Sequence, residues 1–292
     1  MTVGVEKSKH TWRELQPELA RKLTDARLQL HHAAQIVTAM GISYLPKQSD
    51  DSHTNLGWLD DISALASHPI RGSSSIQLAV RPHPFALLLL DNSEPSASFM
   101  LDRHTIADAA AWVRDNISKR GLDGSAFTLA KHYTIPSHPV GDSAPFDARD
   151  MPAFDALSAW FSDSARVLEA LVATTPNAAP VRCWPHHFDI ATLVEVAPGK
   201  TVGFGLEPGD VYYAEPYFYV NMYPFPSAAP TTKLPGGGSW HSHEWIGAVL
   251  PGSRLGREGQ REQIDAFFAA AIAEATRTLV IPSEARDLGR GA

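Results

Sequence analysis

Apolar residues recur every three or four positions in four stretches of the chain, a spacing that aligns them along one face of an α-helix. We predict helices over residues 16–39, 105–119, 152–173 and 261–279. In the first of these, Pro17 suits the opening turn, where its missing N–H breaks no helical hydrogen bond. We expect Gly41 and Pro46 to end this helix, because glycine and proline are common just beyond a helix C-terminus.

Shorter apolar or alternating runs, separated by turn residues, indicate β-strands between these helices. The first half carries them at 75–81, 85–91, 98–101 and 127–135, and the second half at 181–196, 201–206, 211–224 and 240–250. The short connections between successive strands favour antiparallel pairing. A Gly-x-Gly-x-x-Gly turn between a strand and a helix, typical of a dinucleotide-binding parallel sheet, is absent from the sequence.

The order of these elements is helix, several strands, helix, and it occurs twice. It predicts an α+β fold with antiparallel sheets and helices packed on one face. We expect a single globular domain over 1–281, with two similar halves at 12–135 and 150–281 as an alternative within it. Residues 136–152, rich in Pro, Asp and Ser, are expected to be a boundary or an ordered connecting loop, and 282–292 a disordered tail.

Composition narrows the class of protein. The 292 residues contain 25 Lys and Arg against 32 Asp and Glu, a net charge of −7, and no basic cluster, which argues against nucleic-acid binding. The longest apolar runs fall far short of the roughly 20 residues that span a membrane, and residues 1–11 lack a secretory apolar stretch. One cysteine, Cys183, excludes an intramolecular disulfide framework. We therefore expect a cytoplasmic protein that acts on neither nucleic acid nor membrane.

Two histidine-containing segments offer candidate chemistry. His187 and Asp189 would share one face of an alternating strand, as a base with its orienting carboxylate or as two metal ligands. His241 and His243 would likewise point the same way and could join them around Zn²⁺ or Fe²⁺. Both patterns are short, and the alternative for each pair is a purely structural role.

The densest aromatic segment runs from Tyr212 to Phe225. Alternation over 217–223 puts Phe218, Val220 and Met222 on the core face, while the other face carries Tyr217, Tyr219, Asn221 and Tyr223. Phenol and amide groups above apolar rings suit an organic ligand or a partner protein. The alternative is a covered strand whose hydroxyls bind backbone groups.

His31 and Gln35 are four residues apart in the first predicted helix, and therefore lie on one face. Taken alone, such a buried pair favours a purely structural role. They also belong to a wider pattern. The pieces are Trp12, Leu30-His31…Gln35-Ile36-Val37, Asn55…Trp58, Pro145-Phe146…Asp150, Phe188-Asp189-Ile190-Ala191, and Tyr217-Phe218-Tyr219…Tyr223-Pro224-Phe225-Pro226. In this order they resemble a bacterial family known only as a domain of unknown function. The resemblance assigns no catalytic roles, but it implies that His31, Gln35, Asp189 and the tyrosine strand contribute to one pocket.

Three functional hypotheses follow from these residues. The first is a protein that binds a small organic ligand through the side chains of His31, Gln35, His187, Asp189, Tyr217, Tyr219 and Asn221. The second is a metal-dependent hydrolase or oxygenase with Zn or Fe held by His187, Asp189, His241 and His243. The third is a protein-interaction module that uses the tyrosine strand as an edge.

Overall fold

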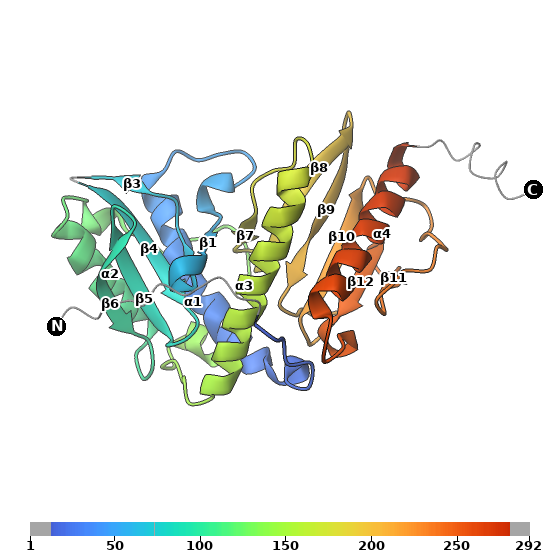
Figure 1. Cartoon of the computed structure of the whole chain (residues 1–292). Coiled ribbons are helices and arrows are strands. Elements are labelled where there is room, and N and C mark those ends of the chain that lie inside the picture. The colour runs from blue at the N-terminus through green and yellow to red at the C-terminus, as the bar shows by residue number, and fades with distance from the viewer. Residues whose placement is uncertain (1–12, 73, 281–292) are drawn as a thin grey trace, which may run out of the picture. The chain divides into compact units, whose positions relative to one another are not determined.

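The computed structural model describes residues 13–72 and 74–280, which divide into two compact units that we treat separately (Figure 1). The first unit comprises Arg13, Lys22–Asp163 and Arg182–Asp189. The second comprises Glu14–Arg21, Ser164–Val181 and residues 190–280. The fold is α+β with antiparallel sheets, as the sequence predicts. The single domain over 1–281 and its two similar halves stay predictions, and the tail at 282–292 lies outside the described residues.

A strongly twisted antiparallel sheet forms the centre of the first unit. Its strands are β1 (Gly57–Leu59), β2 (Ala64–Ala66), β3 (Ile70–Arg71), β4 (Ser75–Arg81), β5 (Ala86–Asp91) and β6 (Glu94–Met100). They lie in the order β1-β2-β4-β5-β6, and β3 also pairs with β4. The strands at 75–81 and 85–91 were predictable from their apolar runs, whereas β1 to β3 are too short for any periodicity to indicate them.

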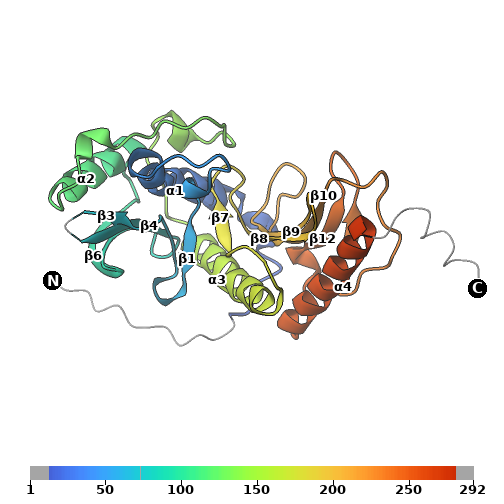
Figure 2. The ribbon, with the colours of Figure 1, turned by 90° about the horizontal axis from the view of Figure 1, so that it is seen from above.

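Two helices, α1 (Thr24–Tyr44) and α2 (Ile106–Ser118), pack on one face of this sheet (Figure 2). The α2 N-terminus is a capping box, in which Thr105 Oγ1 accepts from the Asp108 N–H and Asp108 accepts from the Thr105 N–H. On the same side, the ring of Trp112 packs 5.6 Å from that of Phe99.

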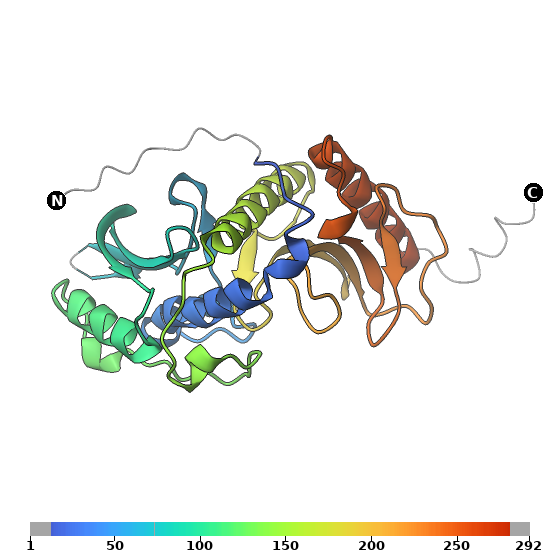
Figure 3. The same ribbon diagram turned by 90° about the horizontal axis from the view of Figure 1, so that it is seen from below.

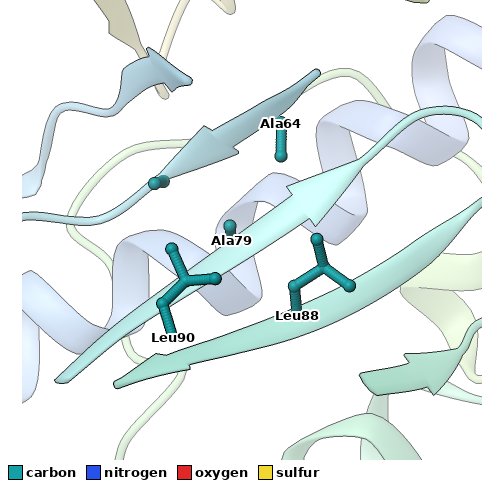
Figure 4. Close-up of a cluster of buried hydrophobic side chains, with 5 residues drawn as sticks. Ala64, Ala79, Leu88 and Leu90 are labelled. Carbon is teal, nitrogen blue, oxygen red and sulfur yellow. The ribbon is translucent and has the colours of Figure 1, made fainter. Parts of the chain in front are cut away.

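The other face of the sheet carries a second apolar cluster. Figure 4 shows Ala64, Ala79, Leu88 and Leu90 projecting from neighbouring strands. Each is no more than 4% exposed, and Leu59 and Ile62 pack against them. Small alanines beside leucines let the short segment 59–62 approach the strands closely, which buries both faces of β4 and β5.

The first helix differs from its prediction at both ends. Pro17 lies in a turn rather than in the helix, which begins at Thr24 after a short 3₁₀ turn, Ala20–Lys22. Gly41 does not end it, because the helix continues to Tyr44. A Cβ atom on Gly41 would lie 2.2 Å from the carbonyl oxygen of His53. Gly41 therefore allows α1 to pack closely against the 3₁₀ turn Ser52–Thr54, and it does not end the helix.

The predicted strand at 127–135 is wrong. After the turn Gly124–Ala126 this segment is irregular, and side-chain hydrogen bonds hold it to α1. The Thr128 N–H donates to Ser43 Oγ, and the Tyr133 hydroxyl donates to Gln35 Oε1. A further 3₁₀ turn, Pro139–Asp142, follows within the predicted connecting loop.

Helix α3 (Met151–Thr174) begins in the first unit. Asp150 caps it as predicted, since its carboxylate accepts from the Ala153 N–H at 3.3 Å. The ring of Phe154 stacks on Phe85 at 4.5 Å, and that of Phe161 stacks on Trp58 at 5.7 Å. These aromatic pairs attach the helix to the ends of β5 and β1.

The sheet of the second unit is antiparallel and is covered by α4 (Gln260–Val280) (Figure 3). Its strands β8 (Asp189–Ala197), β9 (Lys200–Glu207), β10 (Tyr217–Tyr223), β11 (Ser239–His241) and β12 (Gly247–Pro251) run in the order β11-β12-β10-β9-β8. Phe268 of α4 packs against the rings of Phe204 and Phe218. Because β10 is paired on both sides, the tyrosine strand is not an edge, contrary to the third hypothesis.

None of the helices in the described part of the chain combines the length and the apolar character that crossing a bilayer requires.

We predict that Gly41→Ala destabilises the protein by about 1–3 kcal/mol, because the added methyl overpacks the contact with His53. Helix propensity alone predicts the opposite, a gain of about 1 kcal/mol. Urea unfolding measures the change. Gly57→Ala is the control, since its Cβ would meet only the tip of Arg182 at 3.9 Å and should be nearly neutral. A stabilised Gly41→Ala would contradict the packing role.

Candidate functional site

A four-residue turn, 185–188, carries the candidate chemistry of the first unit. It follows β7 (Arg182–Trp184) and precedes β8, and Phe188 adopts a left-handed φ of 76°. The alternating strand predicted through His187 and Asp189 is therefore interrupted. His187 is exposed, whereas Asp189 is 8% exposed, so the two side chains do not share one strand face. Pro185 and its neighbours prevent the regular pairing that alternation requires.

His31 and Gln35 do lie on one face of α1, and both reach the same atom. His31 Nε2 donates to the carbonyl oxygen of Pro185 at 2.8 Å, and Gln35 Nε2 donates to it at 2.9 Å. A carbonyl oxygen has two lone pairs and accepts both bonds. The ring of His31 also stacks on Phe188 at 4.6 Å, with only 7° between the planes. The helix thus fixes the turn at two points, the carbonyl oxygen of Pro185 and the ring of Phe188.

Burial determines the charge of these histidines. Desolvation lowers the pKa of His31 from 6.5 to about 3, outweighing the opposing effect of the hydrogen bond to Pro185. His186 has its pKa lowered to about 4, first by burial and then by the neighbouring His187. Both imidazoles are therefore neutral at pH 7, and His31 carries its proton on Nε2 because Pro185 can only accept. His31 serves as a fixed donor rather than as a general base.

Gln35 connects this anchor to a hollow on the surface of the first unit. Its Oε1 accepts from the Tyr133 hydroxyl at 2.9 Å, so the amide group is bonded on both sides. Burial raises the pKa of Tyr133, which keeps the phenol protonated and donating. Tyr133 is thereby held against α1 although its backbone belongs to the irregular segment after α2.

The hollow beside Tyr133, which we call the first-unit hollow, has a volume of about 590 Å³. Its apolar lining comes from α1, the start of α2 and the following segment, with Ile36, Ile106, Leu129 and Ile135. The other lining residues are Gly141 and the polar residues His32, Gln35, Lys131, Tyr133, Thr134, Ser137, His138 and Asp142. An apolar floor with a few placed polar groups is the usual construction of a small-molecule site.

Two histidines of this hollow are positioned by backbone and carboxylate partners. His32 Nε2 donates to the Pro136 carbonyl oxygen at 3.1 Å, and burial lowers the pKa of the His32 ring. Its Nδ1 is then an acceptor. His138 contacts Asp25 Oδ1 through Nε2 at 3.1 Å, and its Nδ1 accepts from the Val140 N–H. The hollow therefore presents His32 Nδ1 as an acceptor in a fixed orientation.

The remaining residues of the predicted ligand set lie in the second unit. Alternation along β10 is confirmed, since Phe218, Val220 and Met222 are at most 1% exposed. Asn221 Oδ1 accepts from the Gly203 N–H at 3.1 Å, a bond within the sheet. Tyr217 is buried, and its hydroxyl donates to Asp210 Oδ2 at 2.8 Å. The ring of Tyr219 lies 6.4 Å from that of Tyr217. Each unit thus holds part of the predicted set.

The second histidine segment also departs from a strand. β11 ends at His241, and Glu244 has a φ of 66°, so His241 and His243 do not project from one strand face. His241 Nε2 donates to the His243 carbonyl oxygen at 2.7 Å, and its Nδ1 lies 3.0 Å from the Tyr213 hydroxyl. Both ring nitrogens are therefore engaged. Across residues 13–72 and 74–280, no group of three or more His, Cys, Asp or Glu side chains is placed to hold a metal ion.

Several lining residues were not identified from the sequence, namely Lys131, Tyr133, His138 and Asp142. Lys131 and Tyr133 lie in the segment 127–135 that the pattern predicts as a strand, and His138 and Asp142 lie in the predicted connecting loop; neither segment carries a motif. The only available signal was the richness of 136–152 in Pro, Asp and Ser, which indicated an ordered loop. Ordered loops on a rigid scaffold commonly carry binding residues.

Comparisons of the chain with protein-family models, curated proteins and solved structures gave no match, so the family resemblance stays a prediction.

We predict that His31 makes the protein less stable in mild acid. Below pH 6.5 His31 becomes protonated in the unfolded chain, whereas in the folded protein it stays neutral until the pH falls to about 3. The contribution of His31 to the free energy of unfolding is therefore fully present above pH 6.5. Below this pH it decreases by up to about 1.4 kcal/mol per pH unit. The measurement is urea unfolding of the wild type and His31→Gln at pH 7.5 and 5.0.

His31→Gln removes the titrating group but keeps a hydrogen-bond donor. Between pH 7.5 and 5.0 the free energy of unfolding of the variant should therefore fall by about 1–2 kcal/mol less than that of the wild type. The exposed His104, changed to Gln, is the control and should leave the wild-type pH dependence intact. An unchanged pH dependence in His31→Gln would show that the buried ring is not the source.

Proposed function

We propose that the protein binds a small organic ligand in the first-unit hollow. The observation that carries this proposal is the combination of a 590 Å³ hollow with Tyr133, whose hydroxyl is fixed by Gln35. The volume lies within the range of about 300–1,000 Å³ that is typical of small-molecule sites. The family resemblance also implies a pocket that includes Gln35.

The lining suggests how such a ligand would bind. Its apolar part would cover Ile36, Ile106 and Ile135, which gains free energy by removing apolar surface from water. Its polar groups would meet the Tyr133 oxygen, which can still accept a hydrogen bond, and His32 Nδ1. Lys131 and Asp142 are exposed at this hollow and supply one charge of each sign. Preorganised partners reduce the entropy lost on binding.

The site works through its support on α1. Because His31 and Gln35 fix the turn 185–188, and Gln35 fixes Tyr133, ligand affinity would depend on residues that do not touch the ligand. His31 is therefore assigned a positioning role, and Tyr133 and His32 a binding role. We further propose that the protein acts in the cytoplasm, a reducing compartment, because its single cysteine, Cys183, allows no intramolecular disulfide bond.

The metal-dependent hypothesis has no comparable support, because the described residues bring no three suitable ligands together. The protein-interaction hypothesis requires the tyrosine strand to be an edge, but β10 pairs with both β9 and β12. Ligand binding is the function that the geometry favours.

We predict that Ser137→Trp weakens ligand binding by filling the hollow. A library of small metabolites is screened by thermal shift; a bound compound at 100 times its Kd adds about 2.7 kcal/mol of stability. Any compound that stabilises the wild type should lose at least about ten-fold in affinity for Ser137→Trp, because the hollow excludes it.

Ser98→Trp is the matched control, since Ser98 is exposed on β6 and does not line the hollow. It should bind every compound as the wild type does. The proposal fails if no compound stabilises the wild type, or if the compounds that do so bind Ser137→Trp with undiminished affinity.

A further inference from the structure

A second hollow, in the second unit, is lined by aromatic and acidic side chains. Its volume is about 450 Å³, and we call it the aromatic hollow. The lining residues are Val211, Tyr212, Tyr213, His241, His243 and Glu244. They come from the connection between β9 and β10, from the last residue of β11 and from the segment that follows it. Val211 is 88% exposed, which leaves the hollow accessible to solvent.

Three rings of this hollow are held in fixed relative positions. The ring of His241 lies 5.3 Å from Tyr212 and 5.7 Å from Tyr213, both edge to face. On a further side it stacks on Trp245 at 4.4 Å. The bonds from His241 Nε2 to the His243 carbonyl and from the Tyr213 hydroxyl to His241 Nδ1 prevent the ring from turning. Tyr212 is 36% exposed, so the arrangement leaves aromatic surface accessible to solvent.

Two carboxylates give the aromatic hollow a negative potential. The Tyr212 hydroxyl donates to Glu244 Oε2 at 2.6 Å. Asp210 accepts from the N–H groups of Tyr212 and Tyr213 and from the Tyr217 hydroxyl. The hydrogen bond to Glu244, together with the nearby negative charges, raises the pKa of Tyr212. Among the described residues, neither lysine nor arginine lines this hollow.

We propose that the aromatic hollow binds a small organic cation with a quaternary ammonium group. Such a cation is attracted by the negative faces of aromatic rings and, unlike a lysine ammonium, carries little tightly bound water. Glu244 supplies the opposite charge. An anionic group next to the ammonium, such as the phosphate of a lipid head group, would be repelled by Glu244 and Asp210, so the ligand is the free cation. This inference concerns the second unit and does not depend on the function proposed for the first.

The test compares choline with 3,3-dimethyl-1-butanol, a neutral molecule of the same shape, by isothermal titration calorimetry on the full chain. We expect choline to bind at least about ten-fold more tightly than the neutral isostere, and to bind more weakly as salt is added. Equal affinities, or no choline binding, would overturn the proposal. Retention of the protein on phosphatidylcholine vesicles without binding of free choline would also overturn it.

Substitutions of the lining residues test whether choline binds in the aromatic hollow. Tyr212→Leu should weaken choline binding by about ten-fold, whereas Tyr212→Phe, which keeps the ring, should stay within about three-fold of the wild type. Glu244→Gln should weaken binding and reduce its salt dependence. Tyr223→Leu is the control, because Tyr223 is 65% exposed at the end of β10 and does not line the hollow. Circular dichroism checks that each variant folds. Equal binding by Tyr212→Leu and the wild type would exclude the aromatic hollow as the site.

Discussion

The carbonyl oxygen of Pro185 is the atom on which the candidate site of the first unit depends. It lies in a turn that no regular ladder can satisfy, and an unpaired buried carbonyl costs about 1–3 kcal/mol. His31 and Gln35, one helical turn apart on α1, supply its two donors. Through the second of them the same helix fixes Tyr133. One backbone atom thus connects a helix, a turn and the wall of the first-unit hollow.

In the second unit a carboxylate, that of Asp210, holds the candidate site in place. Asp210 accepts from two backbone N–H groups of the connection between β9 and β10 and from the Tyr217 hydroxyl on β10. This attaches an irregular segment to a buried strand and leaves Tyr212 and Tyr213 at the surface. In both units the sheet and helices are the rigid part, and the side chains available for binding extend from irregular backbone.

Periodicity was sufficient to predict the helices and the long strands, because each has one face that must be buried. It was insufficient where a local contact decided the backbone. Gly41 has the signature of a helix end, yet it meets the His53 carbonyl inside a continuous helix. The left-handed residues Phe188 and Glu244 interrupt two apparent strands. The stacking of His31 and Gln35 on one helix face was predictable, whereas Pro185 as their common partner was not, since it is 150 or more positions distant in sequence.

The most direct test of this account is the protonation state of His31, read from long-range ¹H–¹⁵N NMR spectra of its ring. We predict a neutral ring at pH 5.5, with the proton on Nε2 and an unprotonated Nδ1, because burial lowers the pKa to about 3 and Pro185 accepts from Nε2. A ring that titrates near pH 6.5, or one that carries its proton on Nδ1, would contradict the anchor at Pro185 and the arrangement of the first-unit hollow that rests on it.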